Sequence, residues 1–160
     1  MRALGRCPAC AMLEPPLESR FPAVEGDQEA CVAIVKQLRV ELANKPGALA
    51  ELCSELAKKA VNISAIQASE AKALGSVRLL VNQFETAKGV CDAIGVKYLE
   101  EQVLAVSIND RPGALGKVTR KLAEKGINIE YVYGSIEKGS KRGLVVLGVN
   151  DVEAAARVAH

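Results

Sequence analysis

The chain has 160 residues, of which 49% are hydrophobic and 25% charged, a balance typical of globular proteins. The formal net charge of +2 and the aromatic content of 3% exclude a strongly basic surface and a base-stacking platform, so we expect no nucleic-acid partner. No apolar run approaches the roughly 20 residues that span a bilayer, so we expect no membrane partner. Five irregularly spaced cysteines favour a reducing, cytoplasmic location.

Residues 1–34 are predicted to form an irregular N-terminal arm, because prolines recur there and apolar residues show little periodicity. Cys7 and Cys10 form a C-x-x-C pair in this arm. A zinc site needs four ligands, and the single histidine is His160, at the other end of the sequence. We therefore expect no metal, redox function or cofactor here unless a partner chain supplies ligands. Met12 is an alternative start that would remove both cysteines.

Residues 35–101 are predicted to form a first domain. Apolar side chains alternate with polar ones over residues 36–42, which predicts a strand with one buried face. The turn Asn44-Lys45-Pro46-Gly47 follows. Proline presets the first turn of a helix, and glycine lets the backbone approach another chain or a ligand. The Asn44 side chain can cap the N–H groups that follow.

After this turn, apolar residues recur at helical spacing from Leu49 to Ala60. Strands are predicted at residues 61–69 and 77–81, a second helix at 84–94, and a fourth strand at 96–101. The order βαββαβ predicts an α+β, ferredoxin-like sandwich with two helices on one face of an antiparallel sheet. Cys53 and Cys91 lie on the apolar helix stripes, where buried, inert thiols are expected. Arg78 alternates with apolar neighbours and is expected to point to solvent or to an interface.

The same pattern returns 66 residues later, so residues 102–160 are predicted to form a second domain of the same fold. Ala43-Asn44-Lys45-Pro46-Gly47-Ala48-Leu49 corresponds to Asn109-Asp110-Arg111-Pro112-Gly113-Ala114-Leu115, and Asn62 corresponds to Asn128. The hairpin loop of the second copy, near residues 137–142, is two residues longer. Ile129, Tyr131 and Tyr133 are expected to share one strand face, where core or interface packing is favoured over ligand contact.

The second copy ends at His160 before a fourth strand, which would leave an unpaired sheet edge. At the 66-residue offset, residues 31–36 stand where the first copy has its fourth strand. We therefore hypothesise that this N-terminal segment fills the vacant position in the second domain. The alternative is that the natural protein continues beyond His160.

The paired turns and the following Asn-Ile dipeptides, Asn62-Ile63 and Asn128-Ile129, resemble those of the ACT domain family, small ferredoxin-like modules that bind amino acids in metabolic regulators. The resemblance covers about residues 35–160 and is nearest to stand-alone tandem ACT proteins, which have no catalytic domain. It implies ligand binding between paired ACT units. The candidate ligand-binding residues are Asn44, Lys45, Pro46, Gly47, Ala48, Leu49, Asn62, Asn109, Asp110, Arg111, Pro112, Gly113, Ala114, Leu115 and Asn128.

Elementary physics favours the same turns, because helix N-termini carry unpaired N–H groups that attract an anion such as an amino-acid carboxylate. The alternative is that Pro-Gly makes a tight turn and Asn or Asp caps it. For Asn62 and Asn128, strand entry or capping is the alternative to ligand contact. We expect a homodimer that senses a free amino acid and acts on a metabolic enzyme or regulator. The competing hypothesis is an interaction module without a small ligand.

Enzyme activity is not expected. The single histidine lies at the terminus, so no histidine-based triad or general base is available. The sequence also has no phosphate-binding glycine loop, since residues 134–139 contain only two glycines and lie in a predicted hairpin.

Overall fold

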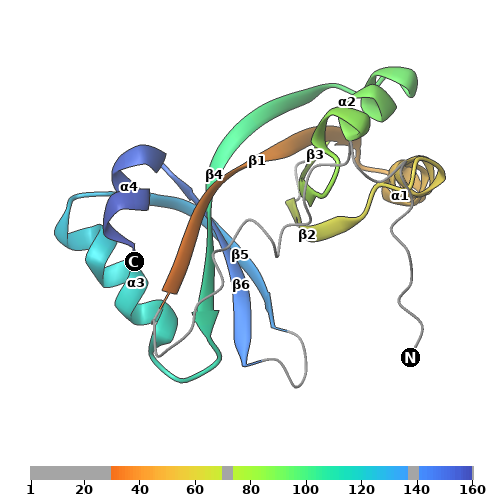
Figure 1. Ribbon diagram of the computed structural model, residues 1–160. Coiled ribbons are helices and arrows are strands. Elements are labelled where there is room, and N and C mark those ends of the chain that lie inside the picture. Colours follow the sequence, from red (N-terminus) through yellow and green to blue (C-terminus); the bar gives the residue numbers. More distant parts are fainter. Residues whose placement is uncertain (1–29, 70–73, 137–140, 160) are drawn as a thin grey trace, which may run out of the picture.

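A computed structural model describes residues 30–69, 74–136 and 141–159 of the chain (Figure 1). The predicted N-terminal arm up to residue 29, including the Cys7–Cys10 pair, lies outside these residues, as do residues 137–140 of the predicted hairpin loop. The elements are, in order, β1 (Ala30–Ala43), α1 (Ala48–Lys58), β2 (Ile63–Ser69), β3 (Leu74–Val81), α2 (Phe84–Ala93), β4 (Tyr98–Asn109), α3 (Ala114–Glu124), β5 (Ile129–Ile136), β6 (Arg142–Val149) and α4 (Val152–Val158). None of these helices is long and apolar enough to cross a bilayer.

Two long antiparallel strands, β1 and β4, hold the two domains together in one sheet of order β2-β3-β1-β4-β6-β5. They pair from Ala30 opposite Ile108 to Val40 opposite Tyr98. The C-terminal half of β1 and the N-terminal half of β4 belong to the first domain, and the other halves belong to the second. Each domain therefore has four strands, in the orders β4-β1-β3-β2 and β1-β4-β6-β5.

The strand pairing confirms the hypothesis that residues 31–36 fill the fourth-strand position of the second domain, because they lie opposite residues 102–107 of β4. It also corrects the predicted boundaries. Residues 30–34 belong to a strand rather than to the irregular arm, and a boundary at residue 34 would cut β1 in two. The predicted fourth strand at 96–101 is likewise the first half of the continuous strand β4.

All four helices cover one face of the sheet, which we call the outer face. Alternate residues of β1 and β4 point to this face, including Leu38 and Val40 at one end and Leu104 and Val106 at the other. They pack with α1 and α2 in the first domain and with α3 and α4 in the second (Figure 1). These two cores contain most of the buried apolar residues. Each buried Leu or Val in them contributes about 1.5–3 kcal/mol of transfer free energy.

The opposite face, which we call the inner face, is concave, because the sheet coils until the edge strands β2 and β5 come into contact. A third apolar cluster fills part of this face, with Ala65 of β2 packed near Tyr131 and Tyr133 of β5. The inner face is thus enclosed by strands of both domains rather than by helices.

A β-bulge at the start of β2 and another at the start of β5 decide which side chains reach the inner face. The register shifts between Ile63 and Ala65, and at the equivalent place between Ile129 and Tyr131. Ile129 therefore packs against the outer core while Tyr131 and Tyr133 lie on the inner face. The expectation that Ile129 and the two tyrosines share a face is wrong, because one extra residue reverses the alternation of a strand.

Candidate functional site

The first Pro-Gly turn links β1 to α1 through a left-handed glycine. Gly47 is the residue before the helix and has φ +90°, which side chains other than hydrogen rarely allow. The Lys45 N–H donates to the Ala43 carbonyl at 2.8 Å, and the Ala48 N–H donates to the Lys45 carbonyl at 3.3 Å. The chain thus reverses sharply and presents the first turn of the 11-residue helix α1 at the molecular surface.

The second turn repeats this geometry. Gly113 precedes α3 with φ +88°, the Arg111 N–H donates to the Asn109 carbonyl at 2.9 Å, and the Ala114 N–H donates to the Arg111 carbonyl at 3.2 Å. The predicted correspondence of the turns therefore extends to their backbone hydrogen bonds. Each turn precedes a helix whose first N–H groups have few intrahelical partners, and this arrangement favours the binding of an anion.

A shallow cavity of about 300 Å³ adjoins the first turn. It lies between the turn and the ends of β2 and β3, and it brings together Asn44, Lys45, Ala48 and Leu49 of the predicted site. The remaining lining residues are Leu42, Ala43, Ala68, Ser69, Gly75 and Val77. Its volume is at the lower end of the range for small-molecule sites.

Asn62 and Asn128 lie away from the turns. Asn62 precedes β2 at the end of the sheet opposite the first turn, where its N–H donates to the Asn82 side-chain oxygen at 2.8 Å. The Asn128 N–H donates in the same way to Asn150 at 3.0 Å. These asparagines therefore close the entry of an edge strand, and the structure does not bring them to the candidate site.

The two turns also lie far from each other. One follows the C-terminal end of β1 at Ala43 and the other follows the C-terminal end of β4 at Asn109, and these strands are antiparallel. The turns are therefore at opposite ends of the central strand pair. The two predicted sets of turn residues therefore lie apart from each other within the chain.

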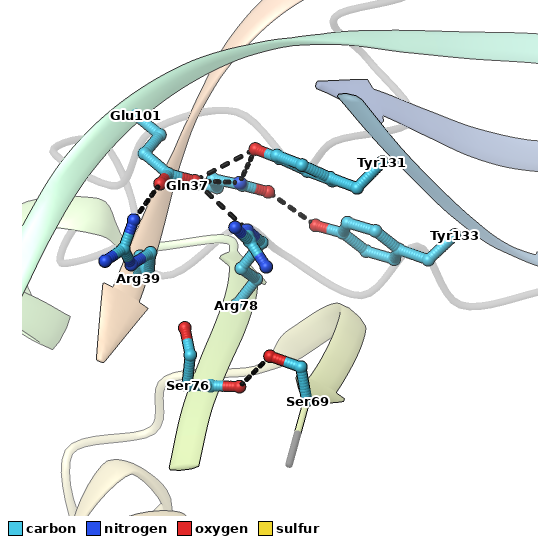
Figure 2. Close-up of polar contacts among 8 residues, drawn as sticks. All are labelled: Gln37, Arg39, Ser69, Ser76, Arg78, Glu101, Tyr131 and Tyr133. Carbon is cyan, nitrogen blue, oxygen red and sulfur yellow. Dashed lines mark hydrogen bonds and ion pairs between the residues drawn. The ribbon is translucent and has the colours of Figure 1, made fainter. Parts of the chain in front are cut away.

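The inner face carries a polar cluster that was not predicted from the sequence, shown in Figure 2. Its centre is Gln37, which is fully buried. The Gln37 Nε2 atom donates to Glu101 Oε2 and to the Tyr131 hydroxyl, both at 2.6 Å, and Gln37 Oε1 accepts from the Tyr133 hydroxyl at 2.6 Å. The Tyr131 hydroxyl in turn donates to Glu101 Oε2 at 2.9 Å. This network ties β5 of the second domain to the central strands.

Two arginines complete the cluster. Arg39 and Arg78 lie directly opposite each other on β1 and β3. Arg39 Nη1 is 3.5 Å from Glu101 Oε1, and Arg78 Nε is 3.3 Å from Glu101 Oε2. The Arg78 guanidinium also lies 3.9 Å from the centre of the Tyr131 ring, a cation–π contact. With 16% of its side chain exposed, Arg78 points into the contact between the two domains, which is the interface of the two expected alternatives and not solvent.

The electrostatics of the cluster keep Glu101 ionised and Tyr131 neutral. Burial alone would raise the pKa of Glu101, but hydrogen bonds from Gln37 and Tyr131 and the charge of Arg78 outweigh burial and lower that pKa. Burial and the hydrogen bond to Glu101 raise the pKa of Tyr131 to about 12. Burial also raises the pKa of Tyr133. Both tyrosines therefore act as hydrogen-bond donors at neutral pH.

Gly148 holds the Tyr131 ring in place. A Cβ atom on Gly148 would lie 2.2 Å from the ring, so the ring covers this cross-strand glycine and can do so only because the glycine has no side chain.

The one signal for the polar cluster in the sequence is the repeat. Gln37 and Arg39 correspond to Val103 and Ala105 in the second copy. Because Val103 and Ala105 are apolar, the second copy's strand is apolar on both sides, which indicates that both faces of the sheet are buried at these positions.

Among the described residues, no group of three or more His, Cys, Asp and Glu side chains could hold a metal ion. Cys31 and Cys91 are buried free thiols, and Cys53 is half-buried. Burial raises the pKa of Cys91 to about 11, so that thiol stays protonated and unreactive at neutral pH.

Comparison with known proteins identifies the family. The sequence profile of the ACT domain pair matches residues 33–159, which is most of the chain. The chain belongs to the ACT domain pair family. A search of curated proteins found no match.

Solved structures share the fold of this ACT domain pair. Protein BT0572 from Bacteroides thetaiotaomicron superposes with a TM-score of 0.74 at 29% identity, over 79% of this chain and 87% of that one. The ligand-free regulatory subunit of aspartate kinase from Thermus thermophilus gives a TM-score of 0.61 at 18% identity, over 83% and 95% of the two chains. The corresponding subunit from Thermus flavus gives 0.58 at 17% identity, over 85% and 97%.

Proposed function

We propose that this ACT domain pair is a non-catalytic regulatory protein that binds a free amino acid at its Pro-Gly turns. The observation that carries the proposal is the cavity of about 300 Å³ against the first turn, which places Asn44, Lys45, Ala48 and Leu49 around one space beside a helix N-terminus. The helix end and Lys45 suit the α-carboxylate of an amino acid, and the Asn44 side-chain oxygen can accept from its ammonium group. Leu49 offers an apolar contact.

The placement of the turns supports a second chain as part of the site. Because Ala43 and Asn109 lie at opposite ends of the antiparallel pair β1–β4, a ligand held between a turn and another ACT unit requires a unit from another molecule. We therefore propose a homodimer in which such interfaces form. Analytical ultracentrifugation checks this, and a monomer that does not change with any amino acid would contradict it.

Regulation of a metabolic enzyme is the second part of the proposal. Separate regulatory subunits of aspartate kinase share this fold. The match with this chain extends over 95% and 97% of the length of the two subunits. A protein of this kind acts in the cytoplasm by changing its packing, or its contact with a partner, when the ligand binds. Ligand binding can shift such an equilibrium only if the two states differ in affinity for it.

A thermal-shift screen of the full chain with each proteinogenic amino acid tests ligand binding. A ligand that binds only the native state raises stability by about 2.7 kcal/mol at 100 times its Kd, so at least one amino acid should raise the Tm in a concentration-dependent way. Unchanged melting at millimolar concentrations of every amino acid would contradict the sensor function and favour an interaction module without a ligand.

The turn location is tested by substituting the cavity residues. We expect Lys45→Met and Asn44→Ala to weaken binding of the amino acid found in the screen, because they remove a charge and an acceptor from the cavity. Lys59→Met, at the exposed C-terminal end of α1, is a matched control that should leave affinity unchanged. Unaltered affinity in both cavity variants would place the site elsewhere.

A further inference from the structure

The inner face holds an excess of positive charge that the described contacts do not balance. Arg39 and Arg78 lie opposite each other on adjacent strands, and both share the single carboxylate of Glu101. Glu41 is two residues along β1 from Arg39, but among the described residues it forms no ion pair with either arginine and instead lines a separate cavity with Lys97. Two neighbouring guanidinium groups repel unless anions separate them, and one carboxylate neutralises only one of them.

Three polar atoms around this arginine pair are buried without a hydrogen-bond partner: Arg39 Nε, Ser76 Oγ and Gln67 Oε1. They are close neighbours in the sheet. Gln67 pairs with Arg78, and Arg78 pairs with Arg39. Ser76 precedes Arg78 by two residues and therefore lies on the same face, with its hydroxyl pointing toward the arginines in Figure 2. Buried polar atoms are almost always satisfied, so three in one place indicate a missing partner.

The chemistry of these atoms defines that partner. Arg39 contacts Glu101 through Nη1, which leaves unused the edge of its guanidinium that contains Nε. A guanidinium edge matches the two oxygens of a carboxylate, and the Ser76 hydroxyl adds a third donor beside it. Gln67 Oε1 can only accept, so it suits an ammonium group. Three donors and one acceptor together are the complement of a zwitterionic α-amino acid.

The arginine pair is more exposed to solvent on the Arg39 side. The Arg39 side chain is 34% exposed, whereas the Arg78 side chain behind it is 16% exposed. Leu99, the cross-strand neighbour of Arg39 on β4, is 53% exposed. Charged ligands can therefore approach over Leu99 and meet Arg39 first.

We propose that the inner face carries a second binding site, separate from the Pro-Gly turns, in which Arg39 binds the carboxylate of a small amino acid, with Ser76 as a further donor and Gln67 as the acceptor for the amino group. Because Glu101 also joins Tyr131 of the second domain, a ligand at Arg39 lies beside the network that closes the coiled sheet. Neither the cavity at the first turn nor its function is needed for this site.

The direct test follows the Arg39 Nε–H group by NMR in the full chain, with its resonance assigned by its loss in Arg39→Lys. Each proteinogenic L-amino acid, and succinate as a carboxylate without an amino group, is titrated in. We expect a saturable shift of the Arg39 Nε–H resonance with at least one amino acid, and no shift for Arg120, an exposed arginine of α3. The absence of a saturable Arg39 shift with every probe would overturn the proposal.

Affinities of variants separate this site from the turns. Arg39→Lys keeps the charge but removes the planar edge, so it should weaken binding at this site about 10- to 100-fold, with Ser76→Ala losing less and Arg120→Lys losing none. If Arg39→Lys binds normally while Lys45→Met does not, the inner site is wrong and the turn proposal stands. If Arg39→Lys loses binding and Lys45→Met does not, the turn location fails and the inner site stands. A shift with succinate alone keeps a carboxylate site and removes its amino-acid specificity.

Discussion

The two domains share their backbone but differ on the inner face of the sheet. The first domain places Gln37, Arg39 and Arg78 there. At the equivalent positions the second domain has Val103, Ala105 and Val146, all of which are fully buried in an apolar cluster. On the outer face, by contrast, both domains pack apolar strand residues against two helices.

This difference shows which part of a duplicated fold is free to diverge. The outer face must bury the apolar stripes of two helices in each domain, and this requirement keeps its residues apolar. The inner face is enclosed by the sheet itself, so one half could become polar provided that its groups found partners. Those partners come partly from the other domain, since Tyr131 and Tyr133 of β5 bond to Gln37 and Glu101. The polar half therefore depends on the apolar half.

The largest effect on this comparison is expected from Gly148→Ala. The added Cβ would lie 2.2 Å from the Tyr131 ring, so the ring must move and its hydroxyl must leave Glu101 and Gln37. We expect a loss of about 3–4 kcal/mol from overpacking and unpaired buried groups, measured by urea denaturation. Gly116→Ala is the matched control. It lies in α3 with open space around it and should stabilise the protein by about 0.5–1 kcal/mol. Equal stability of the two variants would show that Tyr131 is not held against Gly148.

Removal of Glu101 should have the next largest effect. Glu101→Ala leaves Arg39 and Arg78 without their shared carboxylate, and we expect a loss of about 2–3 kcal/mol in the free energy of unfolding at pH 7. Glu124→Ala, at the exposed end of α3, should change stability by less than about 0.5 kcal/mol.

The pH dependence of stability gives a separate test of the same residue. The folded-state pKa of Glu101 is lowered, so its contribution is complete above the ordinary value of 4.5 and is lost as the pH falls through the folded-state pKa. Glu101→Gln should therefore unfold less steeply than the native protein as the pH falls below about 4.5. Parallel stability curves of the two proteins in this range would contradict the network in which Glu101 is ionised.

A smaller effect is expected from Gln37→Val, which gives the first domain the residue that the second has at Val103. The variant removes a donor from Glu101 and leaves the part-buried Tyr133 hydroxyl without its acceptor. We expect a loss of about 1–2 kcal/mol, partly offset by added apolar burial. Gln102→Val on the exposed side of β4 is the control and should change stability by less than about 0.5 kcal/mol. A stabilised Gln37→Val variant would show that the polar cluster has no net role in stability.

The fold could be predicted from the sequence because the repeat shows the residue pattern of corresponding strands and helices twice. A gap in one copy, the missing fourth strand, was resolved by the position of residues 31–36 at the same offset, and the pairing with β4 agrees. The continuity of β1 across residue 34 could not be found in this way. A boundary between duplicated domains carries no turn signal when one strand continues from one domain into the other.

The polar cluster could not be predicted, because strand alternation shows which residues share a face but not whether that face is covered. Gln37 and Arg39 alternate with Leu38 and Val40, which is the pattern of a half-exposed strand. Coiling of the sheet encloses them, and that curvature depends on contacts between β2 and β5, which are distant in sequence. The bulge before Tyr131 was also invisible, since no glycine or proline marks it.

The smallest effects test whether the two turns are as alike as their backbones indicate. Gly47 and Gly113 have φ values of +90° and +88°, and neither has an atom within 4 Å of an added Cβ. Gly→Ala at either position therefore introduces backbone strain without a clash, and we expect the same loss of about 1 kcal/mol in each turn. Chemical denaturation of both single variants and of the double variant checks this. Because the turns lie at opposite ends of β1 and β4, the two losses should add. A clearly larger loss at Gly113, or a double variant that departs from the sum, would show that the domains differ at their turns as well as on the inner face.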